Sequence, residues 1–149
     1  DVLEAVDWMK RLNKSASQLA VEFNLHGGTD VTGFGILGHG LEMADTSKVS
    51  LMLELASIPF ISGARKYARK GCFAGGAFDN KAHFESKVSF DATIDEEDQM
   101  LLFDPQTSGG LLLGVPSERL ESFLARAREL LQPAWVIGRV EAGAGIHVE

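Results

Sequence analysis

Apolar residues recur every three or four positions in several stretches, and this spacing predicts amphipathic helices. The first helical stretch covers residues 1 to 23, with an interruption expected near Asn13 to Ser17. The clearest one follows Pro116 and Ser117, a favourable helix start, and places its leucines, Phe123 and Ala127 on one stripe. The expected helices are 1–23, 36–44, 61–70, 94–103 and 118–131.

Short apolar or alternating runs between the helices predict strands. The expected strands are 23–26, 49–55, 87–90, 111–115, 134–140 and 146–148. Residues 111–115 are almost wholly apolar, which is typical of a strand buried on both faces. Residues 72–84 are rich in glycine, and we expect them to be irregular. The mixed order predicts an α/β (α+β) fold, a layered sandwich of a mixed sheet with helices, in a single domain over residues 1–149.

The composition narrows the class of protein. A hydrophobic fraction of 45% with 23% charged residues is typical of a globular chain. The single cysteine, Cys72, cannot form an internal disulfide, so a cytoplasmic location is expected and the thiol is interpreted as buried or incidental. No run is long enough for a membrane span and the first residues lack the basic-then-apolar pattern of a signal peptide, so no membrane partner is expected. The start at Asp, without Met, suggests a fragment.

The net charge of −7 argues against a nucleic-acid partner, because affinity for the phosphate backbone comes from clustered Lys and Arg. The basic cluster consists of Arg65, Lys66, Arg69 and Lys70, and its spacing is that of one solvated helix face. The four histidines show neither metal-ligand spacing nor an obvious carboxylate partner, so zinc is not expected.

Two polar glycine loops, residues 27–35 and 104–110, are the candidates for chemistry, because function concentrates in loops on a rigid scaffold. Gly33, Gly35 and Gly38 match the G-x-G-x-x-G pattern of dinucleotide sites, and Glu54 follows at a suitable distance. That interpretation is disfavoured, because polar residues separate the glycines from the preceding strand.

Asp30 lies between two threonines in the first loop and offers hard oxygen ligands of the kind that Mg²⁺ prefers. One carboxylate cannot hold the ion alone, so other ligands would come from water, phosphate or a part outside this chain. The competing interpretation is that Asp30 caps the following helix or bonds within its own turn, and spacing alone favours it.

The second loop places Thr107 and Ser108 before Gly109 and Gly110, so hydroxyl and backbone N–H groups are available for an anion. These residue types also form tight turns, and the residues alone favour a helix-to-strand turn.

Together the two loops, Thr29-Asp30-Val31-Thr32-Gly33-Phe34-Gly35 and Asp104-Pro105-Gln106-Thr107-Ser108-Gly109-Gly110, resemble the paired signatures of the selenophosphate synthetase (selenide, water dikinase) family. The resemblance covers essentially the whole chain and matches the carboxy-terminal domain, which that family shares with aminoimidazole ribonucleotide synthetase. Residues 75–80 only loosely resemble a glycine-threonine-arginine-asparagine segment of the family, and no role is transferred to them.

The resemblance implies an enzyme that makes selenophosphate, AMP and phosphate from ATP, selenide and water, with Mg²⁺ as an essential ion. It implies that an amino-terminal domain outside this chain supplies most of the ATP site, that the full-length protein is a homodimer, and that the fragment alone is inactive. It assigns Asp30 to the Mg²⁺–phosphate cluster and places Thr32 and residues Thr107, Ser108, Gly109 and Gly110 along the same cleft.

Two other interpretations remain open. The chain could belong to a sister ATP-dependent enzyme of the aminoimidazole ribonucleotide synthetase or thiamine-phosphate kinase type. It could also be a structural or partner-binding module whose glycine loops only turn the chain.

Overall fold

The computed structural model describes residues 1–149 as a mixture of helices and strands, which confirms the predicted class. The helices are α1 (Val2–Met9), α2 (Lys14–Glu22), α3 (Gly35–Ser47), α4 (Ala64–Ala68), α5 (Gly75–Phe84), α6 (Glu96–Leu102) and α7 (Leu120–Glu129). The strands are β1 (Gly27–Asp30), β2 (Val49–Leu53), β3 (Val88–Phe90), β4 (Leu111–Gly114), β5 (Gly138–Ala142) and β6 (Ile146–Val148). Single 3₁₀ turns lie at Leu55–Ser57, Glu85–Lys87 and Ser117–Arg119.

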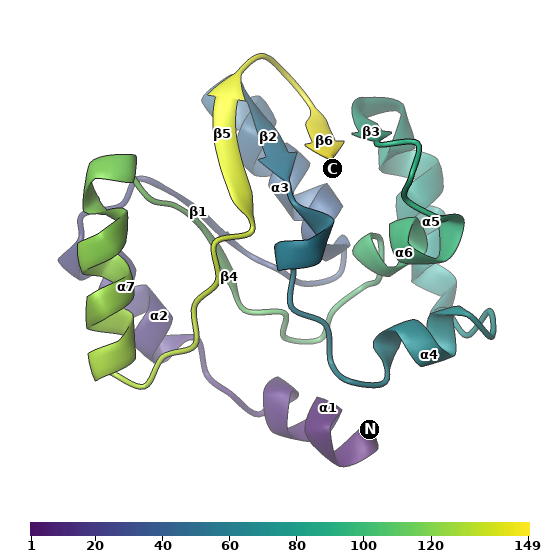
Figure 1. Cartoon of the computed structure of the whole chain (residues 1–149), viewed down its shortest axis with the longest axis horizontal. Coiled ribbons are helices and arrows are strands. Elements are labelled where there is room, and N and C mark those ends of the chain that lie inside the picture. Colours follow the sequence, from purple (N-terminus) through teal and green to yellow (C-terminus); the bar gives the residue numbers. More distant parts are fainter.

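The larger sheet has the strand order β3-β6-β2-β5. β6 is parallel to both of its neighbours, whereas β5 is antiparallel to β2, so the sheet is mixed as predicted. α3 packs against this sheet and lies behind β2 in Figure 1. Buried side chains of α3 and the sheet, joined by Phe103 at the end of α6, form the main core, which includes Leu37 and Leu41.

β1 and β4 form a separate antiparallel ribbon. Leu112 of β4 packs against the main core, while the next residue, Leu113, packs against a second cluster formed by Leu19 of α2 with Phe123 and Ala127 of α7. Alternate side chains of a strand point to opposite faces, so the ribbon separates the two clusters. Both faces of β4 therefore contact apolar groups as predicted, although its residues are only half-buried.

Four local predictions are wrong. Residues 27–30 form a strand where a loop was expected, and no strand forms at 23–26. Residues 75–84 form α5 where irregular structure was expected, because Ala77 and Asn80 are buried against the rest of the fold. The strand expected at 134–140 begins only at Gly138, where pairing with Leu53 of β2 starts.

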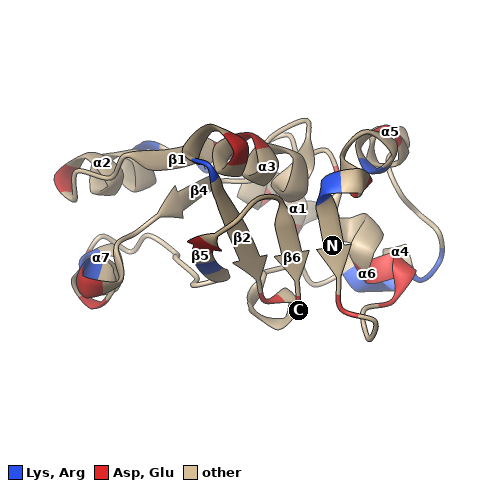
Figure 2. Cartoon of the chain, turned by 90° about the horizontal axis from the view of Figure 1, so that it is seen from above, with Lys and Arg blue, Asp and Glu red and all other residues tan.

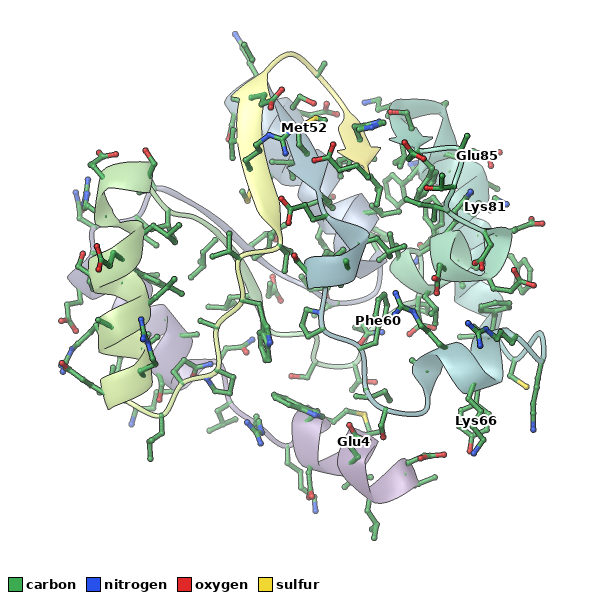
Figure 3. The ribbon with its side chains drawn as sticks, in the orientation of Figure 1. Glu4, Met52, Phe60, Lys66, Lys81 and Glu85 are labelled. Carbon is green, nitrogen blue, oxygen red and sulfur yellow. The ribbon has the colours of Figure 1, made fainter.

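Charged side chains of both signs are interspersed over the surface helices, as Figure 2 shows for α7. Glu22 of α2 accepts from Arg126 of α7 at 3.0 Å, and Lys81 of α5, labelled in Figure 3, lies 3.0 Å from Glu96 at the start of α6. Arg65 of the expected basic face is paired with Asp98 at 3.0 Å. None of the helices is both long and apolar enough to span a bilayer.

Candidate functional site

The β1–β4 ribbon brings the two glycine loops together. The register pairs Asp30, the last residue of β1, with Leu111, the first residue of β4, so both loops leave the same end of the ribbon. The Val31 N–H donates to the Gly110 carbonyl at 2.9 Å, and the Gly109 N–H donates to the Val31 carbonyl at 2.9 Å. Segments about 75 positions apart in the sequence thus form one polar surface.

Asp30 lies at this junction with an exposed side chain. Its carboxylate takes part in no hydrogen bond and no ion pair of the structure. The interpretation of Asp30 as a helix cap is wrong, because α3 has Phe34 at its N-cap position and no side-chain cap. A ligand at the Asp30 carboxylate would therefore displace no contact within the chain.

Donors in the second loop are also free. The backbone N–H groups of Thr107, Ser108 and Gly110 donate to no acceptor within the chain, and neither do the two hydroxyls. Gly109 differs, since its N–H is used by Val31 and a Cβ at this position would lie 2.8 Å from the Val31 carbonyl oxygen. The close approach of the two loops therefore explains why residue 109 is glycine.

Asn80 of α5 forms hydrogen bonds at the ends of both loops, and the sequence pattern did not indicate this role. Its Nδ2 donates to the Gly33 carbonyl in the first loop and to the Phe103 carbonyl just before the second, each at 2.9 Å. It is the one buried polar side chain among residues 1–149. Both carbonyls lie far from Asn80 in the sequence, so no local pattern indicates the contact.

Replacing Asn80 with Ala should reduce the free energy of unfolding by about 2 kcal/mol, because a carbonyl buried without a donor loses its full solvation. Asn80→Asp should be at least as destabilising at neutral pH, since an ionised carboxylate would face two carbonyl oxygens. Urea denaturation of both variants measures this. Unchanged stability in both would show that Asn80 does not connect the loops.

The histidines are better partnered than the sequence suggested. His39 of α3 has Nδ1 at 3.1 Å from Oε2 of Glu42, so the expectation of no carboxylate partner is wrong for this residue. The spacing of three positions on a helix could have indicated it. His26 instead contacts Asn24, and His147 contacts Ser89. Cys72, expected to be buried or incidental, is exposed.

Asp104 begins the second loop, and partial burial raises the pKa of its carboxyl above the ordinary value, although a hydrogen bond from Gln106 acts in the opposite direction. Buried carboxyls with perturbed pKa values are typical of functional sites. The raised pKa means that the folded chain binds a proton at Asp104 more tightly than the unfolded chain does. Ionisation of Asp104 therefore costs stability as the pH rises through the folded-state pKa.

Asp104→Asn should raise the thermal unfolding midpoint at neutral pH, because the amide cannot ionise and still accepts a hydrogen bond from Gln106. The difference from the original chain should shrink as the pH falls towards about 3, below the ordinary pKa of Asp. Thermal unfolding monitored by circular dichroism across this range measures it. A difference that stays constant with pH would contradict ionisation of Asp104 as the cause.

The geometry restricts the bound groups that the site can hold. No three His, Cys, Asp or Glu side chains of this chain converge as a metal cage. A dinucleotide site does not fit. The strand before the glycines pairs only antiparallel with β4, and Gly38 is closely packed against the Phe84 ring, 2.7 Å from an added Cβ.

Comparisons with known proteins agree with this architecture. Selenide, water dikinase from Caldanaerobacter subterraneus subsp. tengcongensis is 44% identical over 142 residues, which is 93% of this chain and 40% of that protein. The protein of the same name from Bordetella bronchiseptica is 45% identical over 149 residues, 100% of this chain and 42% of that protein. This chain thus spans about two fifths of the length of these relatives.

Solved structures share the fold at low sequence identity. Thiamine-monophosphate kinase from Stenotrophomonas maltophilia K279a aligns with a TM-score of 0.54 and 17% identity, over 87% of this chain and 33% of that one. The protein tt0281 from Thermus thermophilus aligns with a TM-score of 0.58 and 22% identity, over 93% of this chain and 35% of that one. The family described as AIR synthase related protein, C-terminal domain, matches residues 2–149. This chain belongs to that family.

Proposed function

We propose that this chain is the carboxy-terminal domain of a selenide, water dikinase, which makes selenophosphate, AMP and phosphate from ATP, selenide and water. The observation that carries the proposal is the identity of 40–45% with proteins of that name over 87–100% of the chain. The free Asp30 carboxylate at the junction of the two loops supports it, because transfer of phosphoryl groups needs cations held beside the phosphates.

In this proposal Asp30 contributes one oxygen ligand to Mg²⁺. An exposed carboxylate without a protein partner suits this role, because Mg²⁺ usually keeps several waters and takes one or two carboxylates besides phosphate oxygens. The bound ion would neutralise charge on the phosphates. The part of Asp30 is to bind and orient that ion from the carboxy-terminal side of the cleft.

The second loop binds phosphate oxygens in the same proposal. Its N–H groups at Thr107, Ser108 and Gly110 and its two hydroxyls donate to no acceptor within the chain. Successive free backbone N–H groups form anion-binding concavities. Gly109 contributes indirectly, by allowing this loop to pack against Val31. In this proposal Thr32 lines the cleft on the opposite loop, where its carbonyl accepts from the Gln106 N–H at 3.0 Å.

The remaining three fifths of the relatives' length would supply the other half of the site. We propose that it forms an amino-terminal domain that binds most of the ATP, and that the full-length protein is a cytoplasmic homodimer. Residues 1–149 form a single domain in this proposal and turn over no ATP alone.

A sister enzyme of the thiamine-phosphate kinase or aminoimidazole ribonucleotide synthetase type is the second candidate. The observation in its favour is the shared fold, including that of thiamine-monophosphate kinase from Stenotrophomonas maltophilia. That likeness has 17% identity and extends to the fold alone, so the selenide, water dikinase proposal takes precedence.

The test is an AMP-release assay with ATP, Mg²⁺ and selenide. The full-length protein should form AMP only when selenide is present, and residues 1–149 alone should form none. Thiamine monophosphate and formylglycinamidine ribonucleotide serve as competing substrates in parallel reactions. ATP consumption that depends on either of these and not on selenide would reject the proposal in favour of a sister enzyme.

A further inference from the structure

His39 contacts the first glycine loop at two points. Its Nε2 lies 3.0 Å from the Thr32 hydroxyl oxygen and 3.3 Å from the Phe34 backbone nitrogen. Its Nδ1 lies 3.1 Å from the Glu42 carboxylate, and only 13% of the side chain is exposed. Both ring nitrogens therefore have partners, and the ring stands between α3 and the loop that precedes it.

The partners decide which nitrogen carries the proton. The Phe34 backbone N–H is a donor only, so His39 Nε2 must accept. The Glu42 carboxylate accepts, so Nδ1 carries the hydrogen. With Nε2 acting as an acceptor, the Thr32 hydroxyl must donate its hydrogen to the ring.

This arrangement limits what Thr32 can offer to a ligand. A hydroxyl has one hydrogen and two lone pairs, and here the hydrogen points into the protein. The Thr32 carbonyl is also occupied, by the N–H groups of Gly35 at 2.9 Å and Gln106 at 3.0 Å. The remaining capacity of the side chain is that of an acceptor, which suits a cation or the water bound to it and cannot donate to a phosphate oxygen.

We infer that His39, oriented by Glu42, is a positioning residue that fixes the loop from Asp30 to Gly35 and presents the Thr32 hydroxyl as an oxygen acceptor on the cation side of the Mg²⁺–nucleotide site. The identity of the ligand rests on the proposed function. The orientation of the loop does not, because it follows from contacts within this chain.

Three variants of the full-length protein separate these roles. His39→Leu keeps the bulk of the ring and removes the acceptor. His39→Gln keeps a carbonyl oxygen near the place of Nε2 and loses the Nδ1 hydrogen. Thr32→Val keeps the shape of Thr32 and removes its hydroxyl. His26→Leu is the matched control, since His26 is exposed at the opposite end of β1 and bonds only to Asn24.

The first measurement needs no substrate. NMR of the imidazole nitrogens should show His39 with Nδ1 protonated and Nε2 unprotonated, and amide exchange at Phe34 should accelerate about tenfold in His39→Leu, the equivalent of one lost hydrogen bond. A protonated Nε2, or unchanged exchange at Phe34, would overturn the positioning role whatever reaction the protein catalyses.

The second measurement concerns the ligand. His39→Leu and Thr32→Val should each weaken binding of Mn²⁺ with a non-hydrolysable ATP analogue by about tenfold or more, as loss of residues supporting a metal site does. His39→Gln should recover most of that loss, and His26→Leu should bind as the original protein does. In steady state the KM for Mg·ATP should rise more than kcat falls.

A purely structural role predicts a different pattern. The Leu and Gln variants would then be equally destabilised, and their affinity for the metal–nucleotide would match that of the original protein. That result would overturn the inference. Selenide-dependent AMP formation by the original protein is judged separately, so failure of the proposed reaction is not confused with failure of the His39 contacts.

Discussion

Asp30→Asn in the full-length protein is expected to reduce selenide-dependent AMP formation by about 100-fold or more, the size of effect seen when one preorganised electrostatic group is removed from an active site. The amide has the same shape as the carboxylate but lacks its negative charge, so its oxygen is a weaker ligand for Mg²⁺. Because the Asp30 carboxylate is exposed and without a partner, the fold should be unaffected.

The measurement is AMP release over a range of Mg²⁺ concentrations, with the thermal unfolding midpoint recorded for each protein. Asp7→Asn is the control, since Asp7 is exposed on α1 and also has no ion pair. Full activity of Asp30→Asn at every Mg²⁺ concentration would remove Asp30 from the site and leave it as a residue at the end of a strand.

Gly35→Ala should lower the free energy of unfolding of the 149-residue chain by about 3 kcal/mol. Gly35 has a φ of +69°, which a residue with a Cβ adopts only at a cost. An added Cβ would also lie 2.8 Å from the Asp104 carbonyl oxygen and 3.1 Å from the Leu102 carbonyl oxygen. These are backbone atoms at the end of α6, so no side-chain rotation relieves the contact.

Gly71→Ala is the matched control for this prediction. Gly71 has nearly the same φ, +70°, but an added Cβ there would meet nothing within 4 Å. Gly71→Ala should lower the free energy of unfolding by only about 1 kcal/mol, because it lacks the steric contact and keeps only the conformational cost of a positive φ. Urea denaturation compares the two variants. Equal losses of unfolding free energy in the two variants would mean that the close approach of α3 to the second loop adds nothing to the cost of Gly35→Ala.

The sequence predicted elements whose stabilising contacts are local or strongly patterned. α7 has an apolar stripe, and a break does separate α1 from α2, although it lies at residues 10–13 and overlaps the expected interval only at Asn13. β1 was missed because two glycines and an aspartate among its four residues carry little strand propensity, and the strand is stabilised by pairing with β4. α5 was missed because its two leading glycines lower helix propensity, which burial of Ala77 and Asn80 overrides.

The candidate site also has residues that the sequence indicated and contacts that it did not. Asp30 and the second loop could be found from their residue types and from resemblance to a family motif. The bond between Val31 and Gly110 depends on a strand that local propensity does not indicate. Asn80 acts on carbonyls 47 and 23 positions away, which no local pattern reveals. His39 and Glu42 were accessible from their spacing, whereas the contact with Thr32 depends on how the loop folds back onto α3.

β6 is the last strand of this chain that the ribosome makes, yet it lies inside the larger sheet between β3 and β2. Ile146 and Val148 are buried in the main core from that position. The ribbon of β1 and β4 and its cover of α2 and α7 are all synthesised by residue 129, so this half can assemble while synthesis continues. Until residue 148 has been synthesised, the edges of β2 and β3 that pair with β6 have no partner strand. Unpaired strand edges are prone to wrong pairing during synthesis.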